Sequence, residues 1–356
     1  MNTAERGSAR LTIRQLAGLG LPAAVALPPL LSALKHLVRS SHAAFFYCDA
    51  QGHMTNMYAE RMLPPETMSR YYERHYRADT HAFSKAYLAR VCASDPVSRR
   101  TVSSTEKQTE YYKDVLAVLG VEHILYGIVR SSSAQREAIG QLSLYRSTDD
   151  PPFNEADSQS LRDVLHYMSR ALGESSFAPA KISAEQTAEE AMAVLDASGQ
   201  VLYSDADWLR LVRLARGDRI VPGNAHEEPR ALRDFLQGVV QATRSSPNVL
   251  HLIDSPWGRF AFRQHTLDAA GGGTAQALIV SRLASDPIRL TEGASRLELS
   301  PQQREVALMI ALGHTNAEIA AKLDVSVNTA GYHVKQVFAK LDVHDRSDVA
   351  RVLRRA

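Results

Sequence analysis

Cysteine is scarce in this sequence of 356 residues, which contains only Cys48 and Cys92. Two cysteines cannot build a disulfide framework or a cysteine metal cluster, and so low a number is typical of a protein from a reducing compartment. The histidines are scattered, and His75 and His81 do not have the spacing of two metal ligands on one helix face. We therefore expect no metal ion and no cofactor.

The motifs of common enzyme classes are also missing. The sequence has no G-x-x-x-x-G-K-S/T, no G-x-G-x-x-G after a strand, no G-x-S-x-G and no H-E-x-x-H. A glycine run at 271–273 lies between two expected strands and has no helix after it, so it does not predict a phosphate-binding loop. We expect no catalytic residues and no enzymatic activity.

Long hydrophobic runs and a strong charge of one sign are absent too. The apolar segment LPAAVALPPLL is interrupted by Pro22, Pro28 and Pro29 and is too short to cross a bilayer. The opening MNTAERGSAR is polar and carries an acid, which does not suggest export. A formal net charge of +2 excludes a strongly basic, non-specific nucleic-acid binder. We expect a globular cytoplasmic protein with no membrane partner.

The last sixty residues carry the clearest pattern in the chain. Ser300 and Gln303 have the spacing of a capping box at the start of one helix, and Thr315 and Glu318 repeat it at the start of a second. A two-residue turn leads to a third helix capped by Ser326, and a fourth helix follows. Short helices with a tight turn between the second and third are the layout of a helix-turn-helix DNA reader.

The third of these helices has two different faces. Its apolar residues recur at helical spacing and are expected to face a small core: Ala330, Val334, Val337, Phe338 and Leu341. The opposite face contains no acid and consists of Asn328, Gly331, Tyr332, Lys335, Gln336 and Lys340. Amide, phenol and ammonium groups suit base edges and phosphates, so we predict that this face binds double-stranded DNA. The alternative is a solvated polar face of a small helical domain.

This segment resembles the LuxR/NarL-type helix-turn-helix family. The family pattern of LSPREREV, G-x-S/T-N-x-E-I-A and S-x-x-T-V-x-x-H followed by KL appears here as LSPQQREV, GHTNAEIAAKL, SVNTAGYHV and AKLDVHDRSD. The resemblance implies that the third helix reads the major groove and that the fourth helps to pair two modules. It places Gly331, Tyr332 and Lys335 at base-contacting positions. Thr329, His333 and Asn316 also match family positions, and for the first two capping and packing remain an alternative to phosphate contact.

The segment departs from the family pattern at two positions. Many family members carry a basic residue where Gly331 and Ala317 stand here. Glycine inside a helix costs about 1 kcal/mol relative to alanine, and it removes a side chain that could touch a base. Eight Lys and Arg against seven Asp and Glu leave residues 297–356 with a net charge of +1. One module should bind DNA weakly, and we expect a homodimer.

Two units of mixed helix and strand are predicted before this module. In the first, two strand pairs separated by helices and closed by a long helix resemble GAF-type modules in layout. In the second, a strand, a turn, a strand and a helix are followed by three strands, which resembles PAS-type domains. The fold class is α+β, with two antiparallel-sheet sensor domains before an all-α four-helix domain. The expected divisions are a GAF-like domain at 1–173, a linker at 174–186, a PAS-like domain at 187–285, a linker at 286–296 and the DNA-binding domain at 297–356.

The first unit contains a set of candidate ligand-binding tyrosines, namely Tyr47, Tyr58, Tyr72 and Tyr76. The alternative is that these tyrosines are packing residues, half-buried in the sheet and the helix with their hydroxyls at the surface. Tyr72 and Tyr76 with Asp79 resemble the residues that hold an acyl-homoserine lactone in quorum-sensing relatives, but the spacing to the acid differs. The unit does not fit a phosphorylated receiver domain, because no acid cluster follows an early strand.

These observations predict a sequence-specific transcription regulator with effector-responsive sensor domains, a small-molecule effector and RNA polymerase as a further partner. One alternative is a sigma-factor-like subunit of RNA polymerase, which would need an upstream helical region rich in aromatic and basic residues. Another is a module that has lost DNA binding and serves in protein docking or dimerisation. Gly331 and the low net charge of the last sixty residues favour this second alternative.

Overall fold

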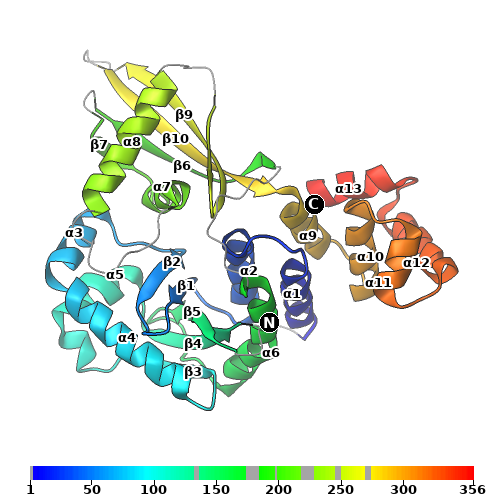
Figure 1. Cartoon of the computed structure of the whole chain (residues 1–356), viewed down its shortest axis with the longest axis horizontal. Helices are drawn as coiled ribbons and strands as arrows, with labels where there is room; N and C mark the ends of the chain where they lie inside the picture. The colour runs from blue at the N-terminus through cyan, green and yellow to red at the C-terminus, as the bar shows by residue number, and fades with distance from the viewer. Residues whose placement is uncertain are drawn as a thin grey trace.

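A computed structural model describes residues 3–131, 136–173, 184–196, 199–217, 228–244, 250–268 and 274–356. Figure 1 shows three parts, with the first sheet at the lower left, the second sheet above it and a group of helices at the right. The two sheets are antiparallel and five-stranded. The expected α+β class, with an all-helical C-terminal domain, is confirmed. No helix in the described ranges is long and apolar enough to span a bilayer.

The first unit is built around a sheet with the strand order β2-β1-β5-β4-β3. Its strands are β1 (His42–Cys48), β2 (Met54–Ala59), β3 (Val97–Thr101), β4 (His123–Arg130) and β5 (Ala138–Arg146). Its helices are α1 (Thr3–Ala17), α2 (Ala23–Leu37), α3 (Pro65–Arg74), α4 (Tyr76–Cys92), η1 (Glu106–Gln108), η2 (Tyr112–Leu116), α5 (Ala117–Leu119) and α6 (Glu155–Leu172). The predicted strand pairs and long helix are confirmed.

Alternation along the central strands gives this sheet two buried faces. On β4, Leu125 faces the main core with Leu161 and Val164 of α6, whereas Ile124 and Tyr126 belong to a cluster under η2 and α5. Successive side chains of a strand point to opposite faces. Helices α2 and α6 therefore cover one face, and the segments from α3 to α5 cover the other (Figure 1).

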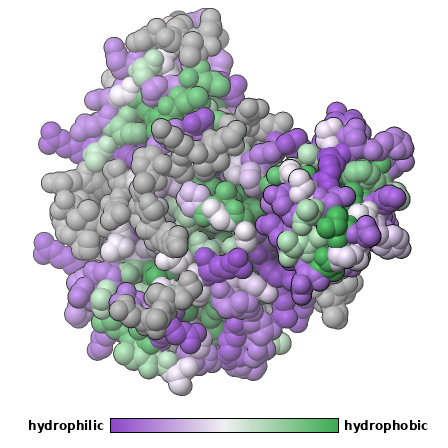
Figure 2. Space-filling view, turned by 45° about the vertical axis from the view of Figure 1, so that its right-hand side comes forward, coloured by the Kyte–Doolittle hydropathy of each residue, from purple (hydrophilic) through white to green (hydrophobic). Residues whose placement is uncertain are grey.

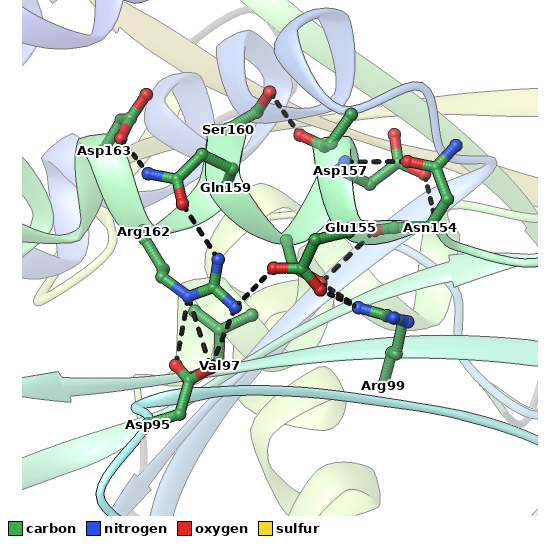
Figure 3. Close-up of polar contacts among 12 residues, drawn as sticks. Asp95, Val97, Arg99, Asn154, Glu155, Asp157, Gln159, Ser160, Arg162 and Asp163 are labelled. Atoms are coloured by element: carbon green, nitrogen blue, oxygen red, sulfur yellow. Dashed lines mark hydrogen bonds and ion pairs between the residues drawn. The ribbon is translucent and has the colours of Figure 1, made fainter.

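Polar contacts fix the start of α6 against the sheet edge. Asn154 and Asp157 form a reciprocal capping box at the start of α6. Arg162 of α6 bonds Asp95, which precedes β3, with a shortest contact of 2.8 Å, and Arg99 of β3 reaches Glu155 at 2.7 Å (Figure 3). These contacts attach the edge strand β3 to the helix that covers it.

The second unit repeats the strand order of the first, as β7-β6-β10-β9-β8. Its elements are β6 (Ala184–Leu195), β7 (Val201–Ser204), α7 (Trp208–Arg216), α8 (Glu228–Arg244), β8 (His251–Ser255), β9 (Gly258–Asp268) and β10 (Thr274–Ser285). Helices α7 and α8 pack on one face of this sheet. Trp257 lies against Tyr58 and Tyr47 of the first unit, with ring centroids 5.8 and 6.4 Å apart, so the two units share one hydrophobic core.

The helical domain follows β10 through α9 (Asp286–Arg296). Its helices are α10 (Pro301–Ala311), α11 (Asn316–Leu323), α12 (Val327–Leu341) and α13 (Arg346–Arg355). Segment 286–296, expected as a linker, is this helix α9, and it adds Leu290 and Ala294 to the core of the domain. Gly293 of α9 lies so close to the carbonyl of Leu353 in α13 that an added Cβ would be 1.8 Å from its oxygen.

Several features differ from the expectations or were not anticipated. Strand β3 and helix α8 were not assigned, and α2 continues through Pro28 and Pro29, where the prolines suggested a break. Eleven of the fifteen residues of α2 are buried, and this packing offsets the hydrogen bonds that the prolines remove. Of the expected linker at 174–186, residues 174–183 lie outside the part of the chain that the structure describes. Residues 184–186 belong to β6. Glycines 271–273 also lie outside them.

Candidate nucleic-acid interface

The helices of the C-terminal domain begin where the sequence places their caps. The Ser300 hydroxyl accepts a hydrogen bond from the backbone N–H of Gln303 at 3.2 Å, and the Gln303 side-chain oxygen accepts one from the backbone N–H of Ser300 at 3.0 Å. Thr315 and Glu318 repeat this arrangement at α11. The Thr315 N–H and hydroxyl hold the pKa of the Glu318 carboxyl below its usual range. Both predicted capping boxes are confirmed.

The turn between α11 and α12 depends on one residue in a left-handed conformation. Asp324 has φ 55° and ψ 49°, which Asp tolerates better than most residues. The chain then passes Val325 and reaches Ser326, whose hydroxyl accepts from the Thr329 N–H at 3.1 Å. The Ser326 and Thr329 hydroxyls also contact each other at 2.8 Å. Thr329 thus has a capping role in the structure.

Helix α12 buries one face and exposes the other. Ala330, Val334 and Val337 are buried, and Phe338 and Leu341 pack beside them, as expected. Asn328, Tyr332, Lys335 and Lys340 are exposed on the other side, and Tyr332 keeps 60% of its surface accessible. Figure 2 shows the helical domain at the right with a largely hydrophilic surface.

Three exposed polar side chains of α12 are not committed to partners within the described part of the protein. Asn328, Lys335 and Lys340 make no hydrogen bond or ion pair in the part of the chain that the structure describes. No acid occurs between Val327 and Leu341, so no carboxylate on this helix opposes a phosphate. Such a face is free to meet DNA without first losing internal contacts.

Two predicted residues are engaged inside the domain. Asn316 receives a hydrogen bond from Arg346, which also donates to the His314 carbonyl at 2.7 Å. The His333 ring lies 3.2 Å from the Gln302 side chain of α10. Both side chains therefore orient α11 and α12, and His333 is half-buried like Gln336.

Gly331 does not fill a sterically restricted position. An added Cβ would meet only the Asn316 side-chain nitrogen, at 3.8 Å, which is ordinary contact. Val327, the first residue of α12, was not among the predicted residues and keeps 53% of its surface accessible. An exposed apolar residue at the helix start suits the methyl group of thymine, and its place outside the apolar stripe was the available signal.

The four candidate ligand tyrosines lie at two separate places. Tyr47 and Tyr58 are 3% and 4% exposed and face the second unit through Trp257. Tyr72 and Tyr76 belong to an aromatic cluster on α3 and α4, with ring centroids 5.6 Å apart. The structure does not bring these two pairs together.

Another pair of tyrosines binds the acid noted in the sequence. The Tyr71 hydroxyl donates to the Asp79 carboxylate at 2.8 Å, and Tyr111 is the second hydrogen-bonding partner of Asp79. Burial raises the pKa of Asp79, and both tyrosines counter part of that effect. Within the described ranges, no three His, Cys, Asp or Glu side chains gather as metal ligands.

Comparison with known proteins identifies the helical domain. Residues 297–353 match the family described as bacterial regulatory proteins, luxR family. The C-terminal domain is a LuxR-family helix-turn-helix domain. This domain is 36% identical over 55 residues to the HTH-type transcriptional regulator YhjB of Escherichia coli K12. That match covers 15% of this chain and 28% of YhjB, so it concerns the LuxR-family domain alone.

Solved structures with a LuxR-type or sensor domain also show some similarity. The phycoerythrobilin-bound GAF domain of a cyanobacterial phytochrome has a TM-score of 0.34 and 12% identity, over 49% of this chain and 96% of that one. The Vibrio cholerae VqmA dimer, titled as a LuxR-type receptor, has a TM-score of 0.18 and 16% identity, over 46% and 81%. With TM-scores below 0.5, these likenesses do not establish a shared arrangement.

Proposed function

We propose that this protein is a sequence-specific DNA-binding transcription regulator whose N-terminal units respond to an effector. The observation that carries the proposal is the outer face of α12, where Tyr332 and Lys335 are exposed on a helix without acids. The luxR family match over residues 297–353 supports it. In the proposed complex, α12 enters the major groove, Tyr332 and Lys335 meet base edges, and Lys340 meets the backbone.

The working unit in this proposal is a homodimer. A net charge of +1 on residues 297–356 gives one domain little non-specific affinity, and two domains on one DNA molecule add their contacts. The edge strand β7 supports pairing of two copies, because Leu202 and Tyr203 keep 51% and 75% of their surface accessible. Unpaired strand edges with apolar side chains tend to bind another chain. Two recognition helices would then enter major grooves about 34 Å apart.

Effector control would act through the direct connection between the second sheet and the DNA-binding domain. Strand β10 ends at Ser285 and α9 begins at Asp286, so no flexible spacer separates them. A change in the sensor units that moves β10 would therefore move α9 and the helices packed on it. Coupling of this kind is typically about 1–3 kcal/mol, which changes operator affinity by roughly 5–150-fold.

Salt-dependent DNA binding tests the proposal. The intact protein should bind a subset of genomic fragments, and its affinity should fall linearly with salt on a double-logarithmic plot. Lys335→Ala should weaken binding by roughly 1–3 kcal/mol, and Lys340→Ala should reduce the salt slope by about one. Fluorescence anisotropy measures both quantities. Arg233→Ala is the matched control, because Arg233 is an exposed arginine on α8.

Two results would contradict the proposal. One is the absence of salt-dependent binding by the intact protein, which would favour the docking or dimerisation module. The other is equal weakening by Lys335→Ala and Arg233→Ala, which would place the DNA contacts elsewhere.

A further inference from the structure

A cavity of about 530 Å³ lies where the three parts of the protein meet. Pockets of 300–1,000 Å³ are the usual size for small-molecule ligands. Residues of α2 and β2 line it from the first unit, residues of β6, α7 and β10 from the second, and residues of α9 and α13 from the helical domain. Figure 1 shows α9 between the second sheet and α13, with α2 nearby.

The walls of the cavity are unusually rich in charge. The charged side chains that line it are Lys35, Glu60, Glu189, Arg210, Arg282, Arg289, Glu292, Arg296 and Arg354, six cationic and three anionic. Ligand pockets are mostly apolar with a few placed polar groups, so this lining points to a polar occupant.

Part of this charge forms a fixed wall. Arg210 and Arg282 are each 7% exposed, and both pair with Glu189, at 2.6 and 2.9 Å. Lys35 pairs with Glu60 at 2.9 Å. Buried ions are costly unless paired, and these pairs satisfy that requirement. Arg210 also pairs with Asp207 at 3.0 Å, so each cation of this wall has a carboxylate partner.

The α9 side of the cavity is different, because Arg289, Glu292 and Arg296 form no contact ion pair in the described ranges, although Arg296 lies near enough to Glu292 to favour its charged form. Arg289 and Arg296 donate only to the backbone carbonyls of Arg354 and Ala356, at 3.2 and 3.3 Å, and neither has a carboxylate partner in the described ranges. The Glu292 carboxylate between them has no hydrogen bond there either, and burial raises its pKa.

A buried hydroxyl adds to this unmatched set. Ser285, at the start of α9, is 3% exposed, lines the cavity and has a buried hydroxyl with no hydrogen-bond partner. Buried polar groups are normally hydrogen-bonded, so this hydroxyl is available to a molecule bound in the cavity. Two guanidinium groups bonded only to backbone carbonyls, a carboxylate without a hydrogen bond and a hydroxyl without a partner therefore line one space.

We propose that this cavity binds a small hydroxylated organic anion, whose carboxylate or phosphate group pairs with Arg289 and Arg296 and whose hydroxyl groups bond Glu292 and Ser285. Arginine is suited to both kinds of anion because its guanidinium donates two parallel hydrogen bonds. The site is distinct from the aromatic cluster around Asp79 in the first unit.

This site would connect ligand binding to DNA binding directly. Both anion-binding arginines lie on α9, and the cavity also touches α13 through Leu353 and Arg354. A ligand seated there would contact the sensor units and the DNA-binding domain at once and would favour the arrangement seen in this structure. The coupling rests on the proposed function, whereas binding of the anion does not.

Calorimetry on the full chain tests the site, with L-malate as the carboxylate probe and glycerol 3-phosphate as the phosphate probe. Glycerol and sodium chloride at matched ionic strength serve as controls. At least one anion should bind with one-to-one stoichiometry, and neither control should. Which probe binds more tightly distinguishes a carboxylate ligand from a phosphate ligand. Absence of binding by both probes up to millimolar concentration overturns the proposal.

Two opposed variants separate specific recognition from general charge effects. The double variant Arg289→Gln, Arg296→Gln should bind the probe at least about tenfold more weakly, because it loses charged hydrogen bonds to the anion. Glu292→Gln should increase the affinity for the probe, because the substitution removes a negative charge that repels the anion and keeps a polar side chain. Arg233→Ala should change nothing. Unchanged affinity in the double variant overturns the proposal, and so does weaker binding in Glu292→Gln.

DNA binding is measured separately with the same variants. DNA binding that responds to the probe in the wild type and not in the double variant supports the coupling. Failure of the protein to bind DNA at all would contradict the proposed function and leave the calorimetric result valid.

Discussion

His42, at the start of β1, is buried in surroundings that disfavour its protonated form. The residue is 4% exposed, and its ring stacks on Tyr145 with centroids 4.7 Å apart. Burial, with Arg61 and Lys35 nearby, lowers the pKa of His42 to about 3. An unfolded histidine has a pKa near 6.5, so the unfolded chain binds the extra proton between about pH 3 and pH 6.5.

This linkage has a definite sign. Because the unfolded state binds more protons in that window, the free energy of unfolding should fall as the pH drops, by up to about 1.4 kcal/mol per pH unit from this residue. His42→Phe keeps an aromatic ring but cannot be protonated, so its thermal midpoint should fall less than the wild type's between pH 7 and pH 5. His36→Asn, at an exposed position of α2, should behave as the wild type does. An identical pH profile for His42→Phe would contradict this explanation.

At the same scale, local sequence pattern predicted most of the candidate interface. The caps at Ser300, Thr315 and Ser326 and the two faces of α12 follow from short-range spacing. The pattern could not show that Asn316 bonds Arg346 from α13, because that contact joins residues thirty positions apart. Tyr111 was missed as a partner of Asp79 for the same reason, whereas Tyr71 lies nearby in the sequence but on the preceding helix.

Among the helices, α9 and α13 approach each other closely at Gly293. Gly293 permits it, because any Cβ at that position would overlap the Leu353 carbonyl. Gly293→Ala should therefore push α9 away from α13 and destabilise the protein by about 1–3 kcal/mol. Chemical denaturation of the full chain measures the change.

Gly238→Ala on α8 is the matched control. This glycine also lies inside a helix, but an added Cβ there would meet no atom within 4 Å. The substitution should be neutral or stabilise the protein by up to about 1 kcal/mol. Equal effects of the two substitutions would contradict close packing of α9 on α13.

Elements with a strong pattern were predicted best. Strands β4 and β5 are rich in apolar residues and form one of the two predicted strand pairs. Strand β3, with the sequence VSRRT, is a largely polar edge strand that has little pattern of its own. Helix α8 does have an apolar stripe, with Leu236, Val239 and Val240 buried, and this signal was available.

On the scale of the whole molecule, the DNA-binding domain is held against the first unit. Arg14 of α1 pairs with Glu305 of α10 at 3.0 Å. Arg304 is 5% exposed and donates to the Ser8 hydroxyl at 3.2 Å, and burial lowers its pKa. These contacts leave the outer face of α12 open, so this arrangement does not hide the proposed DNA-binding surface.

The sequence could not predict how the three parts fit together. The apolar pattern shows which face of an element is buried but not which distant element covers it. The contact of Trp257 with Tyr58, the docking of α10 on α1 and the cavity at the junction all depend on such long-range choices.

Selection of DNA fragments from a random library by the full chain tests the central claim most directly, with Tyr332→Ala compared in parallel. The wild type should enrich a sequence with two related half-sites about 10 base pairs apart, or a multiple of that, and Tyr332→Ala should lose preference at one position of each half-site. No enrichment by the wild type, or the same enriched sequence from both proteins, would contradict the proposed role of α12.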